Sequence, residues 1–334
     1  MVYELLGISL ALAALLTLNA VVTLGASALW RLTLARRTLG WPSPARANLV
    51  FALRTFPLLT ASACVLTLLI PAYVIHEPRH TTEEIGPTLV ALASLSAVGL
   101  ALALFRGLSA WVATRRLVGD WMRHAEPADL PDAGVPAYLL RHSFPLIAVV
   151  GVFRPRLFVA SQVIDALSRD ELSAAIAHET GHLRAHDNLK RATLRVCRDV
   201  LSIFPSGRLL DRTWAQSAEM AADESAARSG GRAALDLAAA LIKIARLVPP
   251  DGRPAIPAGA YINGAGADGV EGRVRRLLQL AAAHSAESRG EDFTLRWLAL
   301  SSASTLLAVV SVPTLSPGTL RAIHEVIEHI VAIL

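Results

Sequence analysis

Two stretches of the sequence, "HEPRH" at 76–80 and "HETGH" at 178–182, match the pattern His-Glu-x-x-His. On a helix this spacing places two imidazoles on one face, where both can bind one zinc ion, and the glutamate can act as a base toward a metal-bound water. A chain of this composition contains such a pattern by chance roughly once in eighty. One zinc site needs only one of the two stretches, so their surroundings have to decide between them.

The surroundings of the first stretch disfavour a helix. Pro78 lacks an N–H and restricts the backbone of the preceding residue, Glu77. The stretch also begins where an apolar run ends, and it is followed by "TTEE". We therefore interpret 76–80 as a loop at a membrane boundary, with surface metal sensing by His76 and His80 as the alternative.

The second stretch lies in a segment with strong helical signals. Ser168 followed by Glu171 is a capping box, which predicts a helix start. The segment that follows has no proline, and its apolar residues repeat at helical spacing, at Leu172, Ala175, Ile176 and Leu183. Gly181 costs about 1 kcal/mol relative to alanine inside a helix, which predicts that it has a packing role. The alternative is a surface helix whose two histidines are merely solvated.

A catalytic zinc ion takes three protein ligands and keeps one position for water, so a third ligand is needed. His186 does not fit, because it would lie about 12 Å from His178 along the helix. The segment 214–231 is rich in small residues and carries Glu219 and Asp223 at a spacing that shares one helix face. We predict that one of these carboxylates binds the metal while the other orients a ligating histidine. The alternative is a solvated acidic helix face.

The segments "RPRLFVASQVIDALSRDELSAAIAHETGHLRAHDN" and "AEMAADESA" resemble the gluzincin membrane peptidases. The resemblance covers roughly residues 145–280 and is closest to the BlaR1/MecR1-like group, peptidase family M56, with the HtpX-like group, family M48, as its relative. It implies one zinc ion per chain on His178, His182 and Glu219, with Glu179 as the base and Asp223 in support. "GRVRRLLQL" resembles a downstream element of these families, which implies that Arg273 supports the active site. HtpX-like proteins often have His-Pro before that arginine, where this chain has "GADGVEG".

Four long uncharged runs account for a composition that is 53% apolar and only 18% charged. Each run is long enough to span a hydrocarbon core of about 30 Å, and buried helices of soluble proteins seldom lack charge over such lengths. The first run lacks the basic start of a cleaved signal and is too long for one. The runs are Leu5–Trp30, Thr55–Ile75, Ile85–Phe105 and Trp297–Leu320, the last with prolines that predict a helix over about 296–313.

The basic residues predict the orientation of these spans. The loop after the first span has five arginines and no acid, the next loop has three glutamates against one arginine, and basic residues follow the third span. We therefore expect the N-terminus outside, the peptidase domain in the cytoplasm and the C-terminus outside. This orientation puts 76–80 across the membrane from Glu219. It also explains the net charge of +5 as a topology signal, without direct nucleic-acid binding. The five arginines are Arg31, Arg36, Arg37, Arg46 and Arg54.

The predicted fold class is an α-helical multi-pass membrane domain plus an α+β zincin-like metallopeptidase domain. Residues 1–125 form the first membrane domain, with transmembrane helices at about 5–30, 55–75 and 85–105. Residues 126–290 form the cytoplasmic metallopeptidase domain, and 291–334 hold the fourth transmembrane helix and a short amphipathic segment. "FPLIAVVGVFRPRLFVAS" predicts two short strands joined around Gly151–Pro155, with an exposed edge that could hold an extended peptide.

These features predict an integral-membrane, zinc-dependent endopeptidase that acts on a peptide or protein substrate at the cytoplasmic face of the lipid bilayer. The M56 resemblance implies regulated proteolysis in signalling, with a cytoplasmic transcriptional repressor or another cytoplasmic or membrane protein as the substrate. Only about 20 residues follow the predicted fourth helix, which ends near 313, so we expect no extracellular β-lactam-binding domain. One alternative is an HtpX-like protease for membrane-protein quality control. An alternative of another class is a non-catalytic membrane sensor with a structural metal site, against which the intact Glu179 argues.

Overall fold

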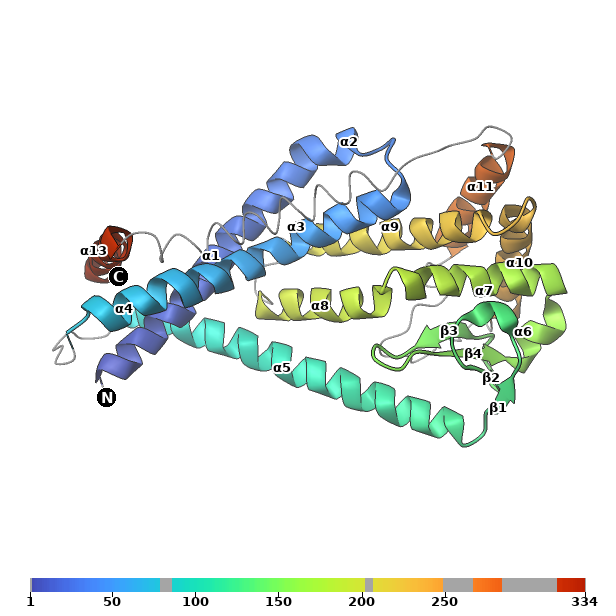
Figure 1. Ribbon diagram of the computed structural model, residues 1–334, viewed down its shortest axis with the longest axis horizontal. Coiled ribbons are helices and arrows are strands. Elements are labelled where there is room, and N and C mark those ends of the chain that lie inside the picture. Colours follow the sequence, from blue (N-terminus) through green and yellow to red (C-terminus); the bar gives the residue numbers. More distant parts are fainter. Residues whose placement is uncertain (1, 79–85, 202–206, 249–266, 284–316, 334) are drawn as a thin grey trace.

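The computed structural model describes residues 2–78, 86–201, 207–248, 267–283 and 317–333. Long helices occupy one side of the molecule, and a small sheet covered by shorter helices occupies the other (Figure 1). The two helices that carry the predicted metal ligands, α7 (Arg169–Arg184) and α9 (Arg208–Ala227), lie where these two parts meet.

Three continuous helical segments among the described residues are long and apolar enough to cross a membrane. The first comprises α1 (Val2–Leu29), a π-helical turn (Trp30–Leu34) and α2 (Ala35–Arg37). The second comprises α3 (Ser43–Cys64), a π-helical turn (Val65–Leu69) and α4 (Ile70–His76), and the third is α5 (Pro87–Met122). The first two apolar runs are therefore helical, as predicted, and so is the third from Pro87 onward; the first two helical segments extend beyond their runs at both ends, and α5 extends beyond its run to Met122. The fourth predicted span lies almost entirely outside the described residues, and α13 (Pro317–Ile333) follows it.

The five arginines assigned to a loop after the first span lie on helices, so that expectation was wrong. Arg31, Arg36 and Arg37 extend the first helical segment, whereas Arg46 and Arg54 belong to α3. Arg54 is buried, with its Nε 2.9 Å from Asp211 Oδ1 of α9 (Arg208–Ala227). A buried charge that is paired inside the protein has little influence on which side of the membrane a segment lies. Only the other four arginines therefore support the predicted orientation.

The start of α3 was missed although Pro44 in its first turn is a local start signal, and a distant helix also contacts it. Glu224 of α9 accepts hydrogen bonds from the backbone N–H of Ser43 (3.1 Å) and from its hydroxyl (2.6 Å). The Glu224 carboxylate thus satisfies a backbone donor at the helix start and places a negative charge there, both of which stabilise a helix N-terminus. Nothing in the local sequence around Ser43 reveals a partner 181 residues away.

The sheet has the strand order β1-β2-β4-β3. The strands are β1 (Glu126–Ala128), β2 (Ala137–Leu140), β3 (Ile147–Val150) and β4 (Arg156–Ala160). β3 and β4 are the two strands predicted on either side of Gly151–Pro155, and the structure pairs them antiparallel. Their turn begins at Gly151, whose φ of 109° favours glycine. A short 3₁₀ turn (Pro131–Ala133) joins β1 to β2, which runs parallel to β4.

β3 is an edge strand, but the expected open edge is partly occupied. All four of its residues are buried. The Val149 N–H donates to Glu179, and the Asn188 side chain donates to the Val149 and Gly151 carbonyls. The backbone groups at this part of the edge are therefore hydrogen-bonded to side chains of α7 and α8.

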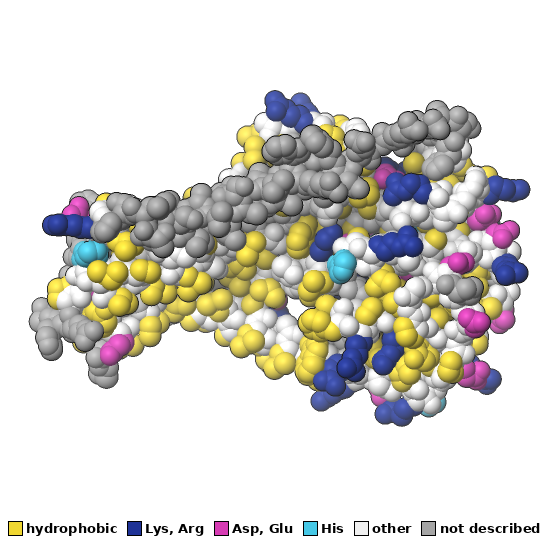
Figure 2. Space-filling view, in the orientation of Figure 1, with side chains coloured by type: hydrophobic (Ala, Val, Ile, Leu, Met, Phe, Trp, Pro, Cys, Tyr) yellow, Lys and Arg dark blue, Asp and Glu magenta, His cyan; other side chains and the backbone are white. Residues whose placement is uncertain are grey.

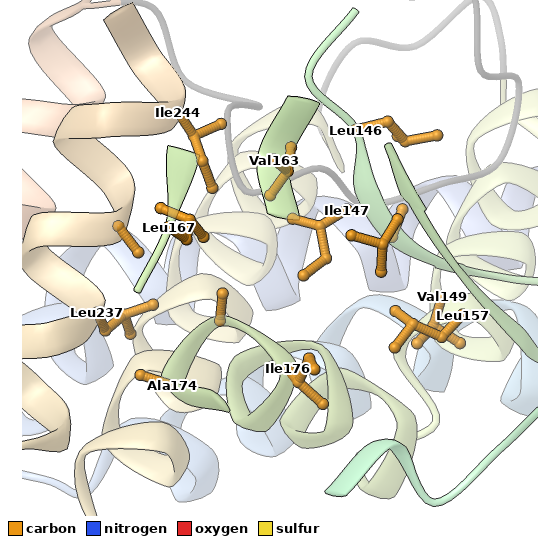
Figure 3. Close-up of a cluster of buried hydrophobic side chains, with 14 of the residues drawn as sticks. Leu146, Ile147, Val149, Leu157, Val163, Leu167, Ala174, Ile176, Leu237 and Ile244 are labelled. Atoms are coloured by element: carbon orange, nitrogen blue, oxygen red, sulfur yellow. The ribbon is translucent and has the colours of Figure 1, made fainter. Parts of the chain in front are cut away.

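The main core lies between the sheet and the helices that follow it. Side chains of β3 and β4 pack with Val163 and Leu167, with Ile176 and with Leu237 and Ile244 (Figure 3). This core fixes α7, on which the His-Glu-x-x-His stretch lies, against the sheet. The helices concerned are α6 (Ser161–Ala166), α7 (Arg169–Arg184), α10 (Ala233–Leu247) and α11 (Ala267–Ala283).

The helix pair α8 (Asp187–Val200) and α9 connects the sheet side of the molecule to the long helices. α8 packs against α5 and α3, and α9 packs against α3 and α7.

The helix predicted over 214–231 is α9. It begins six residues earlier, at Arg208, and ends at Ala227 before the glycine pair, which lies in the following turn.

Candidate metal centre

α7 begins and packs as the sequence predicts. Ser168 and Glu171 form the reciprocal capping box, with the Glu171 carboxylate accepting from the Ser168 N–H at 2.7 Å. A Cβ on Gly181 would lie 3.2 Å from Ala222 Cα of α9, so this position allows close helix approach. Gly181 therefore brings the face of α7 that carries the two histidines against α9.

The three predicted metal ligands lie together. Suitable ligand atoms of His178, His182 and Glu219 are all within 4.8 Å of one another, and this is the one such group among the residues that the structure describes. Glu219 Oε2 lies 3.7 Å from His178 Nε2, and Glu219 Oε1 lies 3.6 Å from His182 Nε2. Two imidazole nitrogens and one carboxylate oxygen form a donor set that suits zinc.

Two of the predicted ligand atoms lack the hydrogen bonds that buried polar atoms normally make. His182 Nε2 and Glu219 Oε2 are buried and make no hydrogen bond with any described residue. Buried polar atoms are normally hydrogen-bonded, so atoms that converge without such partners need another explanation. A metal ion would satisfy both, and the residues present therefore fit the zinc that the resemblance implies.

Each histidine is oriented by an aspartate through its other ring nitrogen. Asp223 Oδ1 lies 3.0 Å from His178 Nδ1, and Asp187 Oδ2 lies 2.7 Å from His182 Nδ1. Carboxylates in these positions hold the ring so that Nε2 is the metal-binding atom. Of the two roles left open for the acidic pair on α9, Glu219 thus has the position of the ligand and Asp223 that of the supporting residue.

Asp187 was missed in the sequence. The signal was available, because two ligating histidines usually need two acceptors, and only Asp223 had been assigned. Asp187 reaches His182 through a sharp turn at His186, which has a left-handed backbone (φ 55°) and is exposed. That conformation is uncommon for a residue other than glycine and is not evident from the sequence.

We expect Asp187→Asn to weaken zinc binding or activity about 10–100-fold, because the amide loses the charge that supports the His182 ring. The measurement is zinc affinity by competition with a chromogenic chelator, together with peptide cleavage. Asp170→Asn is the matched control, since Asp170 is an exposed aspartate on the first turn of α7. Equal zinc affinity and activity in the two variants would exclude a supporting role for Asp187.

Arg273 of α11 lies at the site, as the resemblance implies. Its Nε and Nη2 donate to the two oxygens of Asp223 at 3.0 and 2.6 Å, and its Nη1 lies 3.4 Å from Glu219 Oε2. Nη2 is also 3.4 Å from each ring nitrogen of His178. Arg273 therefore holds the two carboxylates of α9 in place.

Glu179 has the surroundings of a general base. It is 1% exposed, its Oε2 accepts the Val149 N–H at 3.0 Å, and its Oε1 makes no hydrogen bond with any described residue. Burial raises the pKa of Glu179 to about 7, against the opposing charge of His182. A carboxyl group with a pKa near neutrality is well suited to take and return a proton at physiological pH.

The electrostatics of the cluster favour a cation between its ligands. Burial works against charge on His182, but Glu219 and Asp187 outweigh it and raise the pKa of His182 to about 10. Burial would likewise raise the pKa of Glu219, but His182 and Arg273 hold it well below its usual range. The carboxylates thus favour a positive charge at this point, either a proton on His182 or a metal ion bound by its deprotonated nitrogen.

The other His-Glu-x-x-His stretch has no such arrangement among the described residues. His76 is the last residue of α4, Glu77 is extended, and His80 lies outside the described residues. The prediction of a loop is therefore confirmed at Glu77 and Pro78 but wrong at His76, which still belongs to α4. α4 ends at the side of the long helices remote from the sheet (Figure 1). The ring of its last residue, His76, lies 5.7 Å from that of His324.

A model of peptidase family M48 matches residues 114–210, which is less than a third of the chain. The matched segment runs from the end of α5 through the sheet, α7 and α8 to the start of α9, and so includes His178, Glu179 and His182. No match is found among the curated proteins. The match supports family M48 and a metallopeptidase, whereas the closer resemblance expected to family M56 is not confirmed.

Proposed function

We propose that this protein is an integral-membrane, zinc-dependent endopeptidase whose active site faces the cytoplasm. The observation that carries the proposal is the convergence of His178, His182 and Glu219 beside Glu179, whose Oε1 has no hydrogen-bond partner among the described residues. A structural metal site would need no such carboxylate and would usually be closed by a fourth protein ligand. The alternative of a non-catalytic sensor is therefore less well supported.

The chain's residues divide the catalytic work between them. His178, His182 and Glu219 would hold the zinc ion, which supplies polarisation of the scissile carbonyl and a water of lowered pKa. Glu179 takes the proton of the attacking water on Oε1 and later delivers it to the leaving amine. The Val149 N–H fixes the carboxylate through Oε2, so the two oxygens have separate roles.

Three apolar helices support the membrane assignment. Apolar side chains cover much of the surface along these helices, whereas charged side chains are frequent over the sheet side of the molecule (Figure 2). Large apolar side chains such as Leu104 (74% exposed) and Val21 (66% exposed) would be costly in water. We propose that these helices span the bilayer, with 126–290 as the cytoplasmic peptidase domain and the fourth span within 291–334.

The substrate proposal has two forms. Regulated cleavage of a cytoplasmic transcriptional repressor follows from the M56 resemblance alone. The M48 match favours the second candidate, an HtpX-like protease that acts on damaged or misassembled membrane proteins. Both forms require a site that accepts a peptide segment without free ends, which is what an endopeptidase assay measures.

The experiment that tests the proposal uses the full chain purified in mild detergent. We expect about one zinc per chain, from the three-ligand site, and cleavage of an unstructured protein at internal bonds. A strong chelator should abolish cleavage, and stoichiometric zinc should restore it. Cleavage that persists after the zinc has been removed, or a protein that binds no zinc, would refute the proposal.

Cysteine labelling tests the proposed orientation. In a background with Cys64→Ala and Cys197→Ala, a membrane-impermeant maleimide applied from outside should label Pro78→Cys but not Gly230→Cys. Both positions are exposed in the structure, so a difference in labelling reports the side of the membrane. Permeabilised cells provide the control, because both variants should then react. Outside labelling at position 230 would overturn the cytoplasmic active site.

A further inference from the structure

A second arginine, which neither the motifs nor the resemblance assigns, lies at the metal centre. Arg191 is on α8, and its Nη2 lies 3.4 Å from Glu219 Oε1. The Arg191 side chain is 18% exposed, and its Nη1 is buried without a hydrogen-bond partner among the described residues. A buried guanidinium N–H beside the site therefore has no acceptor from the residues that the structure describes.

The two arginines flank Glu219 on opposite oxygens and are held differently. Arg273 reaches Oε2 and is engaged by both oxygens of Asp223, which fixes it as a support for α9. Arg191 reaches Oε1, the oxygen that faces His182, and its charge also acts on Glu179. Arg191 is thus close to the ligand and the base while retaining a donor that neither of them uses.

α8 holds Arg191 rigidly in this position. Leu194, Cys197 and Val200 are buried on the same helix, and Lys190 donates to Asn48 of α3 at 2.7 Å. The Arg191 guanidinium also lies over the ring of Trp214 on α9, 5.9 Å from the ring centroid, within cation–π distance. A donor fixed in a partly desolvated site interacts with a developing negative charge more strongly than it would in water.

We propose that Arg191 is a catalytic residue that donates its Nη1–H to the carbonyl oxygen of the scissile peptide bond. This inference rests on the proposed peptidase function. When the water oxygen attacks the carbonyl carbon, the π electrons of the C=O bond move to the carbonyl oxygen, and one water proton passes to Glu179. When the C–N bond breaks, the negatively charged carbonyl oxygen forms the C=O bond again with the electron pair it had gained. The leaving amine nitrogen takes the proton from Glu179. Arg191 stabilises the negative charge between these steps, and its own protons remain in place.

The test compares Arg191→Met with Arg198→Met, which removes the same charge from an exposed position of the same helix (Arg198 side chain 51% exposed). We expect Arg191→Met to keep its zinc and to lose about 10²–10³-fold in kcat with little change in KM, as for removal of an oxyanion donor. A phosphonamidate peptide, whose tetrahedral anion imitates the attacked carbonyl, should bind the variant more weakly by a similar factor. The matched uncleaved peptide should bind within about threefold, when measured by calorimetry in a Glu179→Gln background. Arg198→Met should behave as the wild type.

Each contrary result has a distinct meaning. If Arg191→Met keeps the wild-type kcat and phosphonamidate affinity, the inference is wrong and the peptidase function stands. If the variant loses zinc in proportion to activity, Arg191 only supports Glu219, and the inference is again wrong. Arg191→Lys, which keeps the charge but not the fixed guanidinium donor, decides the matter if the methionine variant does not fold, with the same losses expected. A wild type that neither binds zinc nor cleaves would instead refute the proposed function.

Discussion

Glu179→Gln is expected to lower peptide cleavage by about 10²–10⁴-fold, the usual contribution of a positioned general base, while the zinc content stays close to that of the wild type. The amide oxygen of glutamine can still accept the Val149 N–H, so the side chain should keep its place. A neutral amide, however, cannot take a proton from water. The change therefore removes one chemical step and leaves the metal ligands intact.

The measurements are zinc stoichiometry and initial cleavage rate on the same preparation. Glu271→Gln is the matched control, because Glu271 is an exposed glutamate (72%) whose partner is Arg275 on the same helix. The control should retain both zinc and activity. A Glu179→Gln variant that cleaves at the wild-type rate would contradict the peptidase assignment, whatever its zinc content.

The parts of this site that the sequence predicts are those that depend on local signals. The capping box at Ser168 and the helical period after it locate α7, and the His-Glu-x-x-His spacing then puts His178 and His182 on one face. Gly181 likewise indicates a close helix contact, which the structure places at Ala222. These predictions succeed because each one needs only the geometry of a single helix.

The parts that were missed depend on how helices meet. Asp187 and Arg191 reach the site from α8, which begins directly after the left-handed residue His186 and brings both side chains to residues of α7 and α9. No periodic pattern reveals such a turn at a residue other than glycine. At the start of α3, Pro44 was a local signal, whereas the bond from the Ser43 N–H to Glu224 depends on how α3 and α9 meet.

The burial of Arg54 shows where charge counting fails. In sequence, Arg54 adds to the basic residues after the first span and supports the orientation. In the structure it pairs with Asp211, so its charge is compensated inside the molecule. The orientation therefore remains a proposal that depends on labelling, whereas the position of α3 against α9 follows from the packing.

Glu219→Ala is expected to lower zinc affinity and cleavage together, by more than about 100-fold, because outer-sphere partners alone contribute about 10–100-fold. Glu219 supplies one oxygen toward each histidine, at 3.7 and 3.6 Å, and both arginines at the site converge on its carboxylate. Its loss would remove a ligand and leave Arg191 and Arg273 facing a proposed cation with less negative charge between them. Zinc affinity should therefore suffer from repulsion as well as from the missing bond.

Two comparisons make this result specific to Glu219. Asp223→Asn should be milder than Glu219→Ala, because Asp223 contacts His178 Nδ1 and Arg273 and acts on the metal through the histidine. His76→Ala should keep full zinc, since His76 is the last residue of α4, which ends at the side of the long helices remote from the sheet. If Glu219→Ala retains wild-type zinc affinity, the third ligand is another group, and Asp223 is next in line because Glu224 is engaged with Ser43 and Arg276. Loss of zinc in His76→Ala with retention in Glu219→Ala would mean that the metal is bound at the other motif.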